Sequence, residues 1–306
     1  MNPLRGIALK IASVCVFVGM ASLIKATSDH VPPGQAVFFR SFFALPVIIA
    51  WLWVRHELST GLRTVSPLGH VWRGVVGTSA MGLGFAGLGL LPLPEVTAIG
   101  YAAPILVVVF AAMFLGEDVR LFRLSMVALG MLGVVIVLSP RLSLGGADTT
   151  HAESLGAMIV LMSAVCAALA QVFVRKMVAT ETTSAIVFWF SITATLMSLL
   201  TLPWGWVIPA PREAMLLILA GVLGGVGQIL LTSSYREADA SLIAPFEYSS
   251  MLLALGVGYI IFDEIPSTTM LVGAAIIITA GIAIILRERQ LGIARARQRK
   301  AMTPQG

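Results

Sequence analysis

Two ionisable residues stand inside long uncharged runs of this sequence, where a charge is hard to accommodate. Glu247 interrupts the run from Ser241 to Phe262, within APFEYSSM, and Arg40 interrupts the aromatic stretch FFRSFF. A buried carboxylate needs water, a hydrogen-bond donor, a cation or a proton. A guanidinium can stack on aromatic rings and hold a polar group through two hydrogen bonds. Both residues are therefore candidates for binding a polar small molecule, and Glu247 is also a candidate for carrying a proton.

Each of these charges also has a structural interpretation. Glu247 could form an ion pair that only stabilises the fold, and Arg40 could extend toward the lipid headgroups. Lys10 lies early in the first apolar run, and we expect its long side chain to reach the surface in this way. Aromatic and neutral polar residues complete the candidate set, although serines and glutamines also join helices to one another in membrane proteins. The candidate substrate-binding residues are Arg40, Tyr101, Phe188, Trp189, Gln228, Glu247, Tyr248, Ser249 and Ser250.

Catalytic and metal-binding patterns do not emerge from the sequence. The four histidines are scattered, and both cysteines fall inside apolar runs. Gly82, Gly84 and Gly87 spell the dinucleotide fingerprint G-x-G-x-x-G, but that motif requires a preceding strand and a helix that begins at the glycines. Here the glycines lie inside an apolar run, where close helix packing explains them better. We therefore expect no catalytic residue, no metal and no cofactor, and predict that the protein is not an enzyme.

The chain as a whole has the composition of a membrane protein. Of its 306 residues, 58% are hydrophobic and 11% are charged, whereas soluble domains contain about 25% charged residues. Mean hydropathy is +0.95. Apolar runs of about 20 residues match, as helices, a hydrocarbon core of about 30 Å. We predict an all-α polytopic membrane protein with ten transmembrane helices, at residues 4–25, 34–54, 71–90, 94–115, 121–139, 154–174, 184–206, 213–235, 241–262 and 268–286.

Lysine and arginine are distributed unevenly between the two sides of these spans. With the N-terminus in the cytoplasm, fifteen of the twenty lie on the cytoplasmic side and three on the opposite side. Positive residues collect in cytoplasmic loops, so we expect a bacterial inner-membrane protein with both termini in the cytoplasm. Segment 287–306 then forms a basic cytoplasmic tail. The positive charge serves topology and lipid contact rather than nucleic-acid binding.

Several residues recur at matched positions in the two halves of the chain. The matched pairs are Cys15 and Cys166, Lys25 and Lys176, Tyr101 and Tyr248, and Glu117 and Glu264. Their offsets of 151 and 147 residues are close to half the chain, which indicates a duplicated unit of five helices. Because five is odd, the two copies must have opposite orientations, as in many secondary transporters. A pseudo-twofold axis would place Tyr101 opposite Tyr248.

The stretches that carry this pattern resemble a known family. They are FFRSFFALP (38–46), LPEVTAIGYAAP (93–104), FLGEDVRLFRLSMVALGMLGVVIVL (114–138), APFEYSSM (244–251) and FDE (262–264). Together they look like the EamA domain of the drug/metabolite transporter superfamily. The resemblance implies two inverted EamA repeats, residues 1–140 and 154–286, joined by a periplasmic linker at 141–153. It also implies a substrate cavity lined from spans 2, 3, 4, 7, 8 and 9.

Within this family the chain looks most similar to the alphaproteobacterial riboflavin transporters. The expected function is therefore transport of a small metabolite by alternating access, with riboflavin uptake favoured. Riboflavin is planar and uncharged, so the aromatic candidates could stack on it, while Gln228, Ser249 and Glu247 could bind its ribityl chain. The S-adenosylmethionine importers share much of the same framework, and an S-adenosylmethionine, amino-acid or other metabolite carrier is the alternative. The expected partners are the small molecule and the lipid bilayer, with a homodimer left open.

Overall fold

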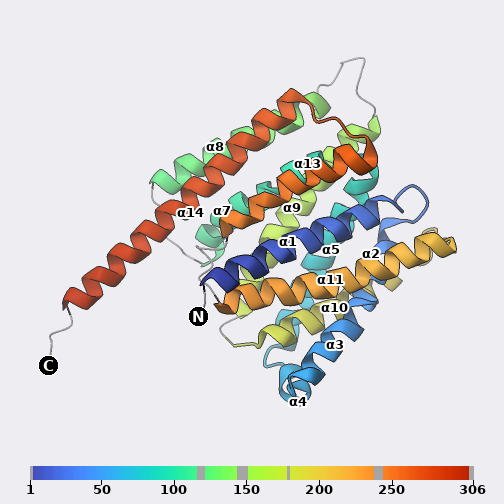
Figure 1. Cartoon of the computed structure of the whole chain (residues 1–306), viewed down its shortest axis with the longest axis horizontal. Coiled ribbons are helices and arrows are strands. Elements are labelled where there is room, and N and C mark those ends of the chain that lie inside the picture. Colours follow the sequence, from blue (N-terminus) through green and yellow to red (C-terminus); the bar gives the residue numbers. More distant parts are fainter. Residues whose placement is uncertain (1–2, 116–120, 143–150, 178–179, 238–243, 303–306) are drawn as a thin grey trace.

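The computed structural model describes residues 3–115, 121–142, 151–177, 180–237 and 244–302, and these contain helices and connecting turns but no strand. Figure 1 shows the helices packed side by side into one bundle. In the first half the helices are α1 (Pro3–Lys25), α2 (Pro33–Phe42), α3 (Ala44–Val54), α4 (Leu58–Gly61), α5 (Pro67–Leu90), α6 (Leu93–Gly100), α7 (Ala102–Leu115) and α8 (Leu121–Leu142). In the second half they are α9 (His151–Met177), α10 (Thr183–Leu199), α11 (Pro211–Glu237), the 3-10 helix η1 (Ala244–Tyr248), α13 (Ser249–Phe262) and α14 (Thr268–Met302).

These helices confirm the predicted all-α membrane fold. Among the described residues, six helical segments are long and apolar enough to cross a membrane: Leu4–Lys25, Pro33–Val54, Leu93–Phe110, His151–Val174, Pro211–Leu231 and Thr268–Arg287. Three shorter apolar helices are Leu124–Pro140, Ser184–Leu199 and Phe246–Phe262. The 24-residue helix α5 occupies the third predicted span. Each of the ten predicted spans therefore coincides with helical structure.

Three of the predicted spans are made of two consecutive helices. The second span is divided between α2 and α3 at Phe43, and the fourth is divided between α6 and α7 at Tyr101. Pro104 explains the second break, because a proline cannot donate to the carbonyl four residues before it and its ring clashes with that carbonyl. In the ninth span η1 gives way to α13 after Tyr248. The two matched tyrosines thus stand at matched breaks.

The closest helix pairs join one half of the chain to the other. The most extensive contacts are between α1 and α11, between α5 and α9, and between α8 and α14. Exchanging the two halves converts the α1–α11 pair into the α9–α5 pair and leaves the α8–α14 pair unchanged. In Figure 1, α8 and α14 run together along one side of the bundle, and α1 lies beside α11. The packing therefore follows the duplication seen in the sequence.

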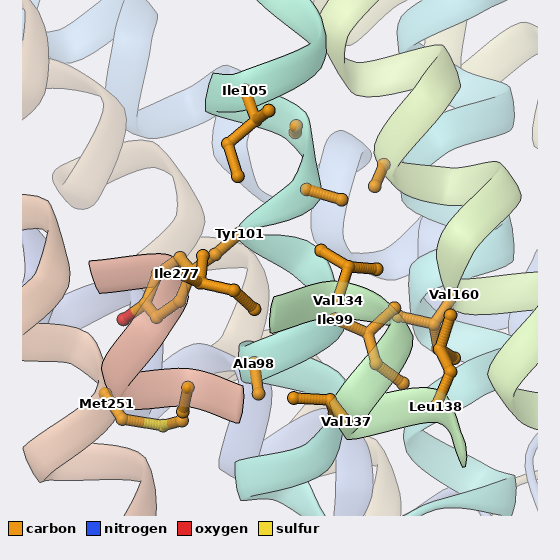
Figure 2. Close-up of a cluster of buried hydrophobic side chains, with 14 of the residues drawn as sticks. Ala98, Ile99, Tyr101, Ile105, Val134, Val137, Leu138, Val160, Met251 and Ile277 are labelled. Carbon is orange, nitrogen blue, oxygen red and sulfur yellow. The ribbon is translucent and has the colours of Figure 1, made fainter. Parts of the chain in front are cut away.

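A buried apolar cluster fills the part of the bundle between α6, α7, α8, α9, α13 and α14. Figure 2 shows this cluster, which includes Ile99, Ile105, Val134 and Ile277. Tyr101 and Tyr248 also belong to it.

The last helix is longer than the predicted tenth span. The sequence predicts that the span ends at residue 286, but α14 continues to Met302. Figure 1 shows it extending beyond the bundle toward the C-terminus. The segment from Leu286 is rich in arginine and glutamine, which are good helix formers, so the basic tail begins as a helical extension.

Candidate functional site

A cavity of about 440 Å³ lies between the two halves of the chain. Its wall comes from α1, α5 and α6 of the first half and from α9 and α10 of the second half. Small residues such as Gly84 and Ala167 leave the space open, and Met81, Phe85 and Leu88 make most of the wall apolar. The volume is in the range of small-molecule binding sites. A small organic molecule therefore fits between the halves.

The lining differs from the one that the family resemblance implied. Spans 3, 4 and 7 contribute as expected, through α5, α6 and α10. Spans 1 and 6 also contribute, through Ala21 and through several residues of α9. Among the described residues, spans 2, 8 and 9 supply none of the wall of this cavity. The expected contribution of those three spans was therefore wrong for this cavity.

Beside the cavity, a group of interactions joins the two halves. Lys25, at the end of α1, pairs with Glu264 at 2.9 Å and donates hydrogen bonds to the carbonyls of Leu88 and Leu91. The second carboxylate oxygen of Glu264 accepts a hydrogen bond from the amide of Leu93 at 2.9 Å. Leu88 and Leu93 are buried and border the cavity. We call this group the Lys25–Glu264 latch.

At the other end of α5 a carboxylate from the second half fixes the start of the helix. Glu181 accepts hydrogen bonds from the amides of Val65 and Ser66 and from the hydroxyl of Thr64. Burial opposes ionisation of Glu181, but these hydrogen bonds and the nearby His70 outweigh it and lower the pKa of the carboxyl group. An ionised carboxylate suits the positive end of a helix. The start of α5 is thus held by a glutamate of the second half, and its end is held by Lys25, which pairs with Glu264.

Among the described residues that border the cavity, Arg73 is the charged one. Its guanidinium lies 3.7 Å from the centre of the Phe190 ring, which also borders the cavity. Nε and Nη1 of Arg73 are buried, and they have no hydrogen-bond partner among the described residues. Arg40, on α2, lies 5.8 Å from the same ring. Arg40 is 6% exposed and its Nε is also buried without a partner.

The nine candidate binding residues predicted from the sequence fall outside this wall. Tyr101 and Tyr248 meet with ring centroids 5.1 Å apart, so the expected opposition of the two residues is confirmed. The hydroxyls of Tyr101 and Ser250 are 2.6 Å apart. This group is part of the apolar cluster, and Tyr248 packs so closely on α14 that a Cβ at Gly281 would overlap its hydroxyl. The paired tyrosines therefore join the two halves in the core.

Glu247 forms an ion pair with Lys10, on α1. The Lys10 side chain is 2% exposed, whereas that of Glu247 is 48% exposed. The expectation that Lys10 reaches the surface was therefore wrong. The sequence around Lys10 does not show its partner, because the carboxylate that reaches its ammonium group is 237 residues away in the chain.

The remaining candidates occupy other parts of the bundle. Trp189 donates a hydrogen bond to the carbonyl of Leu62, and Phe188 packs on a small apolar cluster of α3. Gln228 is half-buried on α11. Ser249 bonds to the carbonyl of Phe246.

Arg73, Thr97 and Ser163 border the cavity but were not selected from the sequence. Thr97 and Ser163 gave no usable signal, because their spacing is that of ordinary packing residues. Arg73 did give one, since it lies inside the third predicted span, but its place near the start of that span makes it resemble a cytoplasmic charge that sets the orientation. A charge six residues inside a helix that is 24 residues long is the feature that points to it.

Known proteins resemble this chain along nearly its whole length. A pseudopaline exporter of Pseudomonas aeruginosa is 30% identical over 281 residues, which cover 91% of this chain and 95% of that protein. An S-adenosylmethionine uptake transporter of Rickettsia bellii is 27% identical and covers 92% and 97%. A riboflavin transporter of Rhizobium johnstonii is 26% identical and covers 84% and 82%.

A solved structure and a family model indicate the same relationship as these relatives. A solved crystal structure with 20% identity superposes with a TM-score of 0.66 over 95% of this chain and 99% of the other, so it has the same fold. The model of the EamA-like transporter family matches residues 4–139 and again residues 154–287. Two tandem matches over most of the chain confirm the resemblance inferred from the motifs. The chain belongs to the EamA-like transporter family.

Proposed function

We propose that this protein is an inner-membrane secondary transporter that carries a small metabolite by alternating access. The observation that carries the proposal is the cavity between the two halves, because a site at a repeat interface can be exposed to either side when the halves rock. The Lys25–Glu264 latch supports the proposal, because it joins the two halves beside the cavity in this conformation. With both termini in the cytoplasm, the latch lies on the periplasmic side.

Riboflavin and S-adenosylmethionine are the two substrate candidates. Each gives its name to one of the related transporters described above. The geometry gives riboflavin less support than the sequence did, because Tyr101 and Tyr248 are buried in the core rather than facing the cavity. S-adenosylmethionine carries a carboxylate, which matches the unpaired guanidinium of Arg73 in the cavity wall. We therefore place S-adenosylmethionine first, and riboflavin second on the strength of its apolar ring system.

The direct test is transport by the purified protein in lipid vesicles. Radiolabelled S-adenosylmethionine and riboflavin are offered separately, and both uptake and release are followed, because export is as consistent with the fold as import. Saturable movement of one compound that empty vesicles lack supports the proposal. If neither compound moves in either direction, both substrate assignments are wrong.

Filling the cavity is expected to stop transport without unfolding the protein. A Cβ at Gly84 meets only the hydroxyl of Ser163, at 3.2 Å, so Gly84→Leu would project its side chain into the cavity. We expect at least a tenfold loss of transport. Gly256→Leu is the matched control, because nothing lies within 4 Å of a Cβ there. Equal transport by the two variants at equal amounts in the membrane would contradict the cavity as the substrate site.

The orientation gives a separate prediction. A reporter enzyme fused after residue 306 should be active only if it is of the kind that works in the cytoplasm, because fifteen of twenty basic residues lie on that side in the proposed topology. A second fusion between residues 143 and 150, in the proposed periplasmic linker, should give the opposite result. Activity of a periplasm-dependent reporter at residue 306 would reverse the orientation.

A further inference from the structure

We propose that Arg73 and Arg40 form a binding site for an anionic group of the substrate, a carboxylate or a phosphate. This inference rests on the proposed transport function, and it defines the class of substrate that the cavity accepts. Riboflavin itself falls outside that class, because it is uncharged at neutral pH.

The first argument concerns the missing hydrogen-bond acceptors of Arg73 among the described residues. Guanidinium groups stay charged at neutral pH and have only donors to offer, and burying such donors without acceptors is costly. In the part of the chain that the structure describes, Nε and Nη1 of Arg73 have no acceptor, although the residue borders a cavity. The face of Phe190 compensates in part, since the negative face of a phenyl ring attracts a cation. An anion in the cavity would supply the missing acceptors.

The second argument is that Arg40 brings another positive charge to the same ring. Both guanidinium groups lie within 6 Å of the centre of Phe190. Like charges repel each other, and these two guanidinium groups act on each other in a buried part of the bundle. Arg40 has little freedom to move away, because its Nε is packed against Gly224, where a Cβ would approach it to 3.0 Å. An anion near Arg73 would relieve this repulsion.

The third argument is the contrast with the other cations of the protein. Within the described residues, Arg5, Lys10, Lys25 and Arg55 each pair with a glutamate. No ion pair involves Arg40 or Arg73 in that part of the chain. Among the described residues Arg63, Arg212 and Arg287 also have no ion pair, but they are exposed to solvent or headgroups, whereas Arg40 and Arg73 have buried guanidinium nitrogens. A transporter must release its ligand on the far side of the membrane. If the protein supplies no carboxylate of its own to these arginines, the anionic group of the substrate can take that position and leave again.

A purely structural role for the stack predicts different behaviour. If Arg73 only packs on Phe190, then anions should bind no better than neutral molecules of the same shape, and a packing substitute should change stability alone. The two interpretations are separated by pairs of compounds that differ in one charged group. Riboflavin and riboflavin 5′-phosphate form one such pair, and S-adenosylmethionine and its decarboxylated form are another.

The experiment measures thermal unfolding of the purified full chain in detergent, with each of these four compounds and with inorganic phosphate, at constant ionic strength. Compared are the wild type, Arg73→Gln and the control Arg55→Gln, which removes a charge from an exposed arginine that stacks on Trp51 outside the cavity. We expect riboflavin 5′-phosphate or S-adenosylmethionine to raise Tm by several degrees more than the partner that lacks its anionic group. This difference should disappear in Arg73→Gln and persist in Arg55→Gln.

Two further variants keep the test decisive. Arg73→Lys retains the charge and should keep part of the anion effect even if Arg73→Gln folds poorly, and Arg40→Gln should weaken the effect about tenfold in apparent Kd. The inference is overturned if no anionic probe shifts the wild type beyond its partner, or if the shift survives in both Arg73→Gln and Arg40→Gln. Transport of riboflavin that is indifferent to Arg73 would leave the carrier function standing and remove this site. Anion binding without any transport would support this site and contradict the proposed transport function.

Discussion

Replacing Gly273 with valine is expected to separate α14 from α8 and to destabilise the folded protein by about 3 kcal/mol, the upper part of the range for overpacked cores. A Cβ at Gly273 would lie 2.5 Å from Cγ2 of Val137, 2.8 Å from the carbonyl oxygen of Gly133 and 2.9 Å from the amide nitrogen of Val137. Two of these three atoms belong to the backbone. They cannot rotate away as the end of a side chain can, so the helices themselves must move apart.

Gly133 of α8 makes the same close backbone contact from the other side, so a larger residue there should have the same effect. A Cβ at Gly133 would lie 2.9 Å from the carbonyl oxygen of Gly273 and 3.1 Å from the amide of Ile277. Close approach of backbones through small residues is a principal source of helix association in membranes, where no hydrophobic force drives helices together. Gly133→Val should therefore be about as destabilising as Gly273→Val. The double variant should lose less than the sum, because one separation of the helices relieves both clashes.

The measurement is reversible unfolding of the purified protein in mixed micelles, followed by circular dichroism. Gly256→Val is the matched control, since it adds the same side chain to a glycine of α13 with nothing within 4 Å of its Cβ. We expect the control to change the free energy of unfolding by less than about 1 kcal/mol. If Gly273→Val is no more destabilising than Gly256→Val, the close α8–α14 contact does not hold the halves together.

The fold could be predicted from the sequence because its determinants are local. A run of about 20 apolar residues has few alternatives to a membrane helix, and the recurrence of Tyr101 and Tyr248 identified the duplication without any structure. The breaks within the spans were harder to foresee. Pro46 and Pro104 each follow a break by three residues, at Phe43 and at Tyr101, whereas Tyr248 interrupts its span with no proline at the equivalent distance.

The candidate site was less predictable because it depends on which helix faces lie next to each other. The sequence identifies intramembrane charges but not their partners, so Glu247 and Arg40 looked equally available. In the structure Glu247 has Lys10, whereas no ion pair involves Arg40 among the described residues. Aromatic residues were similarly ambiguous: Tyr101 and Phe190 are both buried, but only Phe190 borders the cavity. Spacing along one helix cannot separate a core face from a cavity face.

The pairing of Lys10 with Glu247 leads to the second large expected effect. Glu247→Ala would leave the ammonium group of Lys10 buried, at 2% exposure, without this carboxylate. Removing one partner of a buried ion pair costs about 3–5 kcal/mol, and because Glu247 is itself half exposed we expect about 3 kcal/mol, the lower limit. Unfolding in mixed micelles measures the loss. Lys10→Met should cost less, because the remaining carboxylate can be hydrated.

A double-mutant cycle separates this structural role from a role of Glu247 in transport. If the pair only stabilises the fold, the double variant Lys10→Met with Glu247→Gln should recover most of the stability lost by Glu247→Gln and should also recover transport, since both substitutions remove the same contact. If Glu247 also carries a proton or binds substrate, the double variant should recover stability while transport stays low. Strictly additive losses of stability would show that the two groups are not coupled. The buried lysine would then need another explanation, and Glu247 would return to consideration as a residue that acts on the substrate alone.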